Sequence, residues 1–463
     1  MIILFVVLFA LPLEPVLGGL TLSGTRLYAM LVIIPFFFAV LSGAAGRVTV
    51  TDGLMLAFAS WMFMTFLMHH GTERFPYAAI TFAELMGGYL AGRLLVCSAI
   101  GYRFFFQAFF VMLLVLLPFA TYEMMTGRAM LSDLLAQIAR VTPRSTEVRE
   151  GYFRAGVSYP HPILWGVIAA MLLAQAWILW ADQTLGRWMR TGVAVACTLT
   201  AMSSAPLLGL AIQIAIILWG RLTGNRWWLL TILFGTTYVA LDILSNRGPV
   251  ILMIETLTLN PQTAWWRVHI WNFGSVSVMN NPWIGIGLND WVRPEWLAAT
   301  VDNFWLLIAM RHGLPAILFL GFALVLHLWQ IIRMRDLSEA DTRVRVAYVI
   351  GLLALSFMLS TVHAWGAPSV LVMFYFGIGT YLYTGGAVRE GDQQISSMDS
   401  NSGNTAAMPR AELPYSRFPH HPSRRTSTRH AADDKAPLGG SGAGRPLRTP
   451  APPAPRANRT SRT

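Results

Sequence analysis

The run FWLLIAMRHGLPAILFLGFALVLHLWQII, residues 304–332, decides the class of this protein. A helix of about 20 apolar residues crosses the hydrocarbon core of a bilayer, and this run is longer than that. The chain is 55% hydrophobic and only 12% charged, with a mean hydropathy of +0.52. Soluble domains carry about 25% charged residues. The sequence therefore predicts an all-α polytopic membrane protein and excludes a soluble enzyme.

Apolar runs of similar length recur along the chain and predict about twelve membrane-spanning helices. The first run lacks a basic region before it and a small-residue cleavage site after it, so we expect it to be retained as a span. The weakest prediction covers residues 191–219, which we divide at Pro206 because proline interrupts a helix. The predicted spans are 2–20, 26–43, 53–68, 78–95, 103–122, 160–181, 191–203, 206–219, 227–245, 304–332, 345–363 and 368–384.

Short loops rich in arginine alternate with two long loops, at about residues 123–159 and 246–302. Positively charged loops remain on the cytoplasmic side of a membrane. We therefore expect the short loops and both termini in the cytoplasm, and the long loops in the periplasm. The second long loop lies between the ninth and tenth spans. Because it combines many tryptophans with Gly and Pro at turn positions, we expect it to be structured, as a lid of short helices.

Residues 386–463 differ from the rest in composition, since Ser, Pro, Arg, Gly and Ala dominate and large apolar side chains are few. Such a segment cannot bury enough apolar surface to fold alone. We therefore expect a helical bundle over residues 1–385, followed by a disordered, basic cytoplasmic tail. The tail carries about half of the net charge of +11. This charge indicates contact with anionic membrane lipids rather than nucleic acid, because no basic patch is interleaved with aromatic residues.

Arginines in the two outer loops are candidates for binding phosphate, because a guanidinium group holds phosphate oxygens as a bidentate fork. Lipid headgroups at the membrane surface are the alternative ligand. Arg267 shares a helix face with Trp271, four residues further on. His161 stands between two prolines at a helix start, either as a rigidly placed polar group or as an ordinary interfacial histidine. The candidates are Arg154, Arg247, Arg267 and Arg293, with His161 and His269 as secondary ones.

Asp302 and Asn303 stand directly before the run 304–332. Either side chain can cap the helix by accepting a hydrogen bond from a free N–H at its start. A carboxylate near a membrane face can also act as a base, which gives Asp302 a catalytic alternative with Asn303 in the structural role. Arg311 lies about 13 Å deeper along the helix. Because charge at that depth is costly, Arg311 should face the bundle or a wet cavity, with a catalytic or a structural role.

Five short pieces follow one another in the second half of the chain: RAGVSYPHP at 154–162, SSAPLLGL at 203–210, WWRVHIWN at 265–272, NPWIGIG at 281–287 and VDNFWLLIAMRHGLP at 301–315. Taken in order, these pieces resemble the O-antigen ligase and O-antigen polymerase superfamily of bacterial envelopes. The resemblance covers about residues 150–384 and implies a membrane glycosyltransferase of about twelve spans. An acceptor hydroxyl would attack the anomeric carbon of a sugar chain, and a polyprenyl diphosphate would leave, at the periplasmic face.

By position, the resemblance implies that Arg267 and Arg154 contact the diphosphate. The chain departs from the family at two places: Ala205 stands where an arginine is common, and Asp302 stands where a histidine is common. The first departure removes one diphosphate contact, which Arg154 or Arg247 would replace. The second makes Asp302 the polar catalytic residue. The expected partners are lipid-linked oligosaccharide, membrane lipids and other polysaccharide export or chain-length proteins, with no metal, nucleotide sugar or other cofactor.

The expected function is thus polymerisation or ligation of lipid-linked oligosaccharide units in exopolysaccharide, O-antigen or lipopolysaccharide biosynthesis. Asp302 in place of histidine favours an exopolysaccharide polymerase slightly. Two other classes stay open: a flippase or transporter of such oligosaccharides, and a non-catalytic envelope assembly protein. A transporter is expected to carry ionisable groups at mid-bilayer and inverted repeats, whereas this chain concentrates its polar residues in the outer loops and has no visible repeat.

Overall fold

The computed structural model describes residues 1–11, 16–17, 20–137, 147–224, 226–244 and 261–385. In these ranges the regular secondary structure is helical, apart from four strands of two residues each. Seven helical segments of the described part are long and apolar enough to cross a membrane by length and composition, which agrees with the predicted class. They are Gly24–Leu41 (α2), Val50–His70 (α3), Ala99–Thr126 (α5), Pro162–Leu179 (α7 and α8), Ser204–Thr223 (α10), Phe304–Arg333 (α14) and Glu339–Leu359 (α15).

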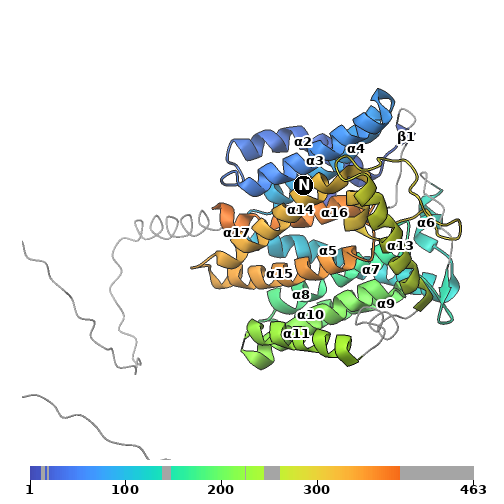
Figure 1. The fold of residues 1–463 in the computed structure, drawn as a ribbon. Coiled ribbons are helices and arrows are strands. Elements are labelled where there is room, and N and C mark those ends of the chain that lie inside the picture. The colour runs from blue at the N-terminus through green and yellow to red at the C-terminus, as the bar shows by residue number, and fades with distance from the viewer. Residues whose placement is uncertain (12–15, 18–19, 138–146, 225, 245–260, 386–463) are drawn as a thin grey trace, which may run out of the picture. The chain divides into compact units, whose positions relative to one another are not determined.

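Helices lie at all twelve places at which the sequence predicts a span, but the first span is wrong over its second half. Its helix ends at Ala10, and the antiparallel strands β1 (Val16–Leu17) and β2 (Leu20–Thr21) follow. The predicted tail, 386–463, lies outside the described residues. Figure 1 shows the long helices side by side, with α6 and α13 at one end and α17 at the other. The remaining helices are α1 (Ile2–Ala10), η1 (Thr72–Arg74), α4 (Phe75–Leu95), α6 (Met130–Leu135), α9 (Thr184–Thr200), α11 (Trp227–Leu244), α13 (Pro261–Asn280), α16 (Ala367–Ile378) and α17 (Tyr381–Thr384), and the bounds of α7 and α8 are Pro162–Ala170 and Leu173–Leu179.

Small residues let α4 pack tightly between α2 and α16 (Figure 1). A Cβ atom added at Gly87 would lie 2.5 Å from the carbonyl oxygen of Ala29 in α2. One added at Gly92 would lie 2.1 Å from the carbonyl oxygen of Phe374 in α16. In a bilayer, close backbone approach of this kind drives helix association, because the lipid offers no hydrophobic force between helices.

Helix α14 is broken at Gly313, whose φ of 76° and ψ of −179° are not helical. The break leaves carbonyl groups without their usual donors, and Pro315 has no N–H to offer Arg311. The loop after α13 supplies the missing donors. The N–H of Ile286 donates to the carbonyl of Met310 at 2.8 Å, and the N–H of Gly287 to that of Arg311 at 2.9 Å. These bonds satisfy backbone groups that could not remain unpaired in a membrane.

The motif NPWIGIG, residues 281–287, is therefore the part of the loop between α13 and α14 that fills the break in α14. Gly285 has a φ of 67°, and a Cβ atom there would lie 2.4 Å from the carbonyl carbon of Arg311. The loop is also fastened to α3, because the N–H of Leu288 donates to Nε2 of His70 at 2.8 Å. Part of the predicted lid, residues 246–260, lies outside the described residues, and residues 261–303 form one helix, α13, and an inserted loop.

Candidate functional site

A pocket of about 260 Å³ lies where α7, α10 and α14 begin. Its walls come from a β-hairpin, from α13 and from the loop ahead of α14. It brings together four of the predicted residues, Arg154, His161, Arg267 and Asp302, from segments that are far apart in the sequence. The full lining is Glu147, Arg149, Arg154, His161, Ile163, Ser203, Ser204, Trp266, Arg267, Ile270, Ala298, Thr300 and Asp302.

The hairpin consists of β3 (Val148–Arg149) and β4 (Tyr152–Phe153), which pair antiparallel with Arg149 opposite Tyr152. Its two turn residues, Glu150 and Gly151, have φ values of 51° and 80°. Positive φ at both positions is typical of the two-residue turn that matches the twist of a hairpin. The turn therefore places Arg149, on β3, beside β4 and close to the chain that follows β4.

Arg154 supports the wall of the pocket and is only 5% exposed. Its Nη2 donates to Oγ of Ser203 at 2.5 Å, and its Nε donates to the carbonyl of Ala201 at 3.3 Å. Its Nη1 forms an ion pair with Glu147. Arg154 thus directs its donors to the protein and fastens the connection between α9 and α10. The other hairpin arginine, Arg149, donates through Nη1 to the carbonyl of Met202 at 3.0 Å and keeps further donors.

Arg267 lies on α13 and has donors to spare. Its Nε is buried and has no hydrogen-bond partner in the described part of the chain. Burial lowers the pKa of Arg267 from the ordinary arginine value. The Asp302 carboxylate offsets part of this shift, and the Arg149 guanidinium lowers the pKa further. The guanidinium groups of Arg149 and Arg267 also repel that of Arg154, whose pKa is lowered chiefly by burial. Gathered cations with unused donors suit a multivalent anion.

Asp302 and Asn303 have separate roles at the start of α14. Asn303 is the N-cap, and its side-chain oxygen accepts a hydrogen bond from the N–H of Leu306 at 3.0 Å. The Asp302 side chain lines the pocket, is exposed, and forms no hydrogen bond or ion pair with another described residue. The capping alternative therefore applies to Asn303, and the Asp302 carboxylate is available to a ligand.

His161 is the N-cap of α7. Its Nδ1 accepts a hydrogen bond from the N–H of Ile163 at 3.1 Å. The proton of the neutral ring therefore sits on Nε2, which lies 3.7 Å from Oε1 of Glu147. His161 is thus a rigidly placed polar group in the pocket wall.

The remaining predicted residues lie elsewhere. Arg293 holds its own loop, since its Nε donates to the carbonyl of Leu297 at 2.9 Å and its Nη1 pairs with Asp290 at 2.5 Å. His269 packs against Trp296, with ring centroids 5.1 Å apart, and does not line the pocket. Arg311 lines a different cavity, beside the first half of α14. Arg247 lies outside the described residues.

Sequence reasoning missed Glu147 and Arg149. Both belong to the stretch TEVREGYFR, residues 146–154, in which alternating side chains flank the pair Glu150-Gly151. A Gly-containing pair between such segments is a hairpin signal. That signal would have placed Arg149 beside the chain that carries Arg154.

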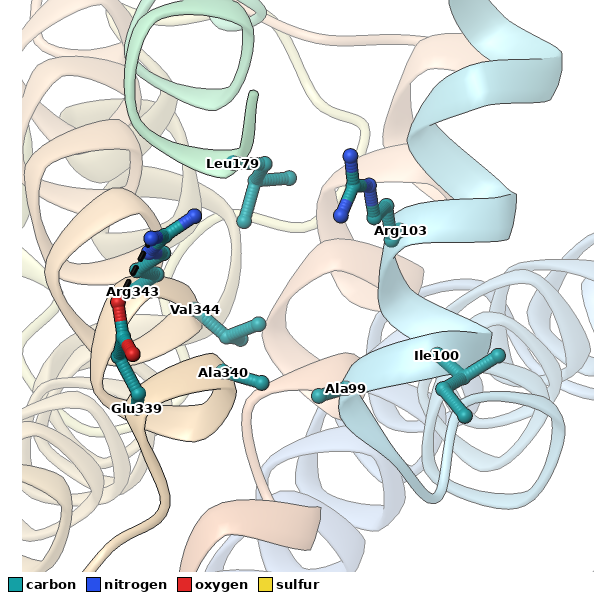
Figure 2. A pocket seen from close by; sticks show the side chains of 8 residues that line it. All are labelled: Ala99, Ile100, Arg103, Leu179, Glu339, Ala340, Arg343 and Val344. Atoms are coloured by element: carbon teal, nitrogen blue, oxygen red, sulfur yellow. Dashed lines mark hydrogen bonds and ion pairs between the residues drawn. The ribbon is translucent and has the colours of Figure 1, made fainter. Parts of the chain in front are cut away.

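A further pocket, of about 360 Å³, lies between the starts of α5 and α15 and the end of α8 (Figure 2). Its two cations have protein partners. Arg343 pairs with Glu339 at 2.7 Å and with Asp182 at 3.3 Å, and Arg103 lies 4.0 Å from Asp182. Because its charges are balanced within the protein, this pocket is the weaker candidate for binding an anion.

Comparison with models of protein families and with curated proteins yields no match to this chain. The candidate site therefore rests on its own geometry. It combines an arginine with unused donors, a second partly engaged arginine and a carboxylate that forms no hydrogen bond with a described residue. Such a set can hold an anionic group and accept a proton from a neighbouring hydroxyl.

Proposed function

We propose that this chain is a membrane glycosyltransferase of the O-antigen ligase and polymerase kind. It polymerises or ligates polyprenyl-diphosphate-linked oligosaccharide at the periplasmic face of a bacterial inner membrane. The observation that carries the proposal is the meeting of Arg267 and Asp302 in one pocket. A diphosphate leaving group needs cationic donors, and an acceptor hydroxyl needs a base.

The proposed topology has twelve spans, with the arginine-rich short loops and both termini in the cytoplasm. The twelve helical segments support it, and so does the position of the pocket at the starts of α7, α10 and α14. The long outer loops contribute the hairpin and α13 to that same end. With this orientation the pocket faces the periplasm, where lipid-linked sugar chains would be presented.

In the proposed reaction, the diphosphate lies beside Arg267 and Arg149, and the acceptor hydroxyl lies beside Asp302. The hydroxyl oxygen forms a bond to the anomeric carbon while the bond from that carbon to the diphosphate oxygen breaks. The electron pair leaves with the diphosphate, whose charge the two guanidinium groups stabilise. The hydroxyl proton passes to the Asp302 carboxylate.

Reconstitution in proteoliposomes with radiolabelled lipid-linked repeat units tests the proposal. The wild type should join units into longer chains or transfer them to an added acceptor. Arg128→Gln provides a matched control, because Arg128 is an exposed outer-loop arginine that does not line the pocket. Movement of labelled units across the bilayer without bond formation would identify a transporter instead. Neither transfer nor movement would leave the assembly protein as the remaining class.

A further inference from the structure

A third cavity, of about 110 Å³, lies beside the first half of α14. It shares no lining residue with the first pocket, the one lined by Arg267 and Asp302. Its size suits an anionic substituent better than a whole repeat unit. Its apolar walls include Phe304 and Trp365. Its charged and titratable lining comes from Arg26, Tyr77, Glu84, Arg311, His312 and His363.

The charges of this cavity do not cancel within the described residues. Arg26 and Glu84 neutralise each other in an ion pair of 2.5 Å. Arg311 is half-buried, and its side chain forms no ion pair or hydrogen bond with another described residue. An unpaired cation in the helical part of a membrane protein is costly, and such residues mark the places where ligands bind.

His363 adds an unused polar atom. Its ring is stacked on Phe304 and on Trp365, with centroid distances of 6.3 Å and 5.8 Å. Its Nδ1 is buried and has no hydrogen-bond partner among the described residues. Burial and the nearby Arg311 charge lower the pKa of His363 to about 4, so the ring is neutral at pH 7. A neutral imidazole with its proton on Nδ1 donates one hydrogen bond into the cavity.

The cavity adjoins the first pocket through an aromatic wall. Phe304 lies two residues after Asp302, and the ring of Trp365 contacts that of His161, with centroids 6.2 Å apart. The cavity therefore lies close to the start of α14, where Asp302 lines the first pocket. This is the position that an acceptor would need in the proposed reaction.

We propose that this cavity binds an oxyanion carried by the acceptor, with Arg311 as its counter-ion and His363 as a hydrogen-bond donor. The inference rests on the proposed function, because it assigns the second substrate of the same reaction. An acidic sugar supplies the oxyanion as a carboxylate, and a second lipid-linked unit supplies it as a phosphate. Both present the same chemistry to a guanidinium fork.

Equilibrium binding to the full-length protein in nanodiscs tests this inference. The probes are a tetrasaccharide ending in glucuronic acid, its carboxyl-reduced counterpart and farnesyl phosphate. Binding is measured in the Arg267→Gln background, so that the first pocket contributes little. One acidic probe should bind about ten-fold or more tightly than the neutral one, as expected for a hydrogen-bonded charge pair. Arg311→Gln should remove that difference, whereas Arg128→Gln should preserve it.

The two acidic probes separate the two sources. Loss of glucuronate binding in Arg311→Gln identifies a carboxylate, and loss of farnesyl phosphate binding identifies a phosphate. If neither probe responds to Arg311→Gln, the inference is overturned. Should Arg311→Gln fail to fold, His363→Phe decides, because it keeps the stacked ring and removes the nitrogen. The acidic probe should bind several-fold more weakly to His363→Phe than to the protein with His363 intact, and unchanged binding would overturn the inference.

Failure of the inference and failure of the proposed function give different results. A protein that binds the acidic probe through Arg311 but never transfers sugar would contradict only the proposed function. A protein that transfers sugar but binds all probes equally with and without Arg311 would contradict only the assignment of this cavity.

Discussion

The side-chain oxygen of Asn303 accepts a hydrogen bond of 3.0 Å from the N–H of Leu306, in the first turn of α14. The neighbouring Asp302 makes no hydrogen bond or ion pair with a described residue and points its carboxylate into the first pocket. Of these two adjacent polar residues, Asn303 thus caps the helix and Asp302 is available to a ligand. This separation allows chemistry and stability to be tested independently.

Asp302→Asn should lower the rate of sugar transfer by about 10²- to 10⁴-fold, the range of a lost general base. The thermal midpoint should stay close to that of the wild type, because Asn303 still caps α14. Asn303→Ala should behave in the opposite way and cost about 1 kcal/mol of stability, as a lost N-cap does. Transfer rates and melting curves of both variants check this, and equal activity of Asp302→Asn and wild type would remove Asp302 from the chemistry.

Arg267→Lys should reduce kcat/KM for transfer by about 10²-fold or more, because a planar fork becomes a point charge. The unpartnered Nε of Arg267 is the donor that lysine cannot replace. Arg128→Lys makes the same chemical change at an exposed position outside the pocket and should have no effect. Near-normal turnover of Arg267→Lys would show that the guanidinium does not clamp the leaving group.

Gly313→Ala should destabilise the protein by about 2 kcal/mol or more, because its φ of 76° disfavours any side chain. A Cβ atom there would also lie 2.2 Å from the carbonyl oxygen of Trp283, in the inserted loop. Gly321→Ala is the matched control on the same helix, because nothing lies within 4 Å of its Cβ position. This change should be neutral or stabilise by up to about 1 kcal/mol. Thermal unfolding in detergent measures both, and equal midpoints would contradict the described break in α14.

The protein should lose stability through His363 as the pH falls from 6.5 toward 4. Burial and Arg311 lower the folded-state pKa of His363 to about 4, from an ordinary value of 6.5. Between these values the unfolded state binds more protons, so stability rises with pH across this window. His363→Phe should remove that dependence, and its thermal midpoint should therefore drop less than that of the wild type between pH 7 and pH 5. If the thermal midpoints of wild type and His363→Phe change with pH in the same way, the ring titrates normally in the folded protein.

The helical segments could be predicted from the sequence because apolar runs of membrane length need no tertiary information. The run 304–332 became α14 almost residue for residue. The break at Gly313 could not be placed in the same way. It depends on donors from Ile286 and Gly287, which are distant in sequence.

The candidate site could be predicted in part. Arg267 stood out as an arginine of a predicted outer loop and Asp302 as a carboxylate directly before an apolar run, and both line one pocket. Arg154 also lines it, but its contacts with Ser203 and Glu147 depend on how the hairpin packs against the helix break. Which arginine keeps free donors is decided by such partners, and composition does not reveal them.

Labelling of a cysteine placed at Thr300 tests the central claim most directly, that an outer pocket binds a lipid diphosphate. Thr300 is exposed and lines the pocket with Arg267 and Asp302. The native Cys97 and Cys197 are first replaced by serine and alanine. We expect a membrane-impermeant maleimide to label Thr300→Cys from the periplasmic side, farnesyl diphosphate to protect it, and Arg267→Gln to abolish the protection. Labelling only after permeabilisation of the membrane, or labelling that farnesyl diphosphate does not slow, would contradict the account.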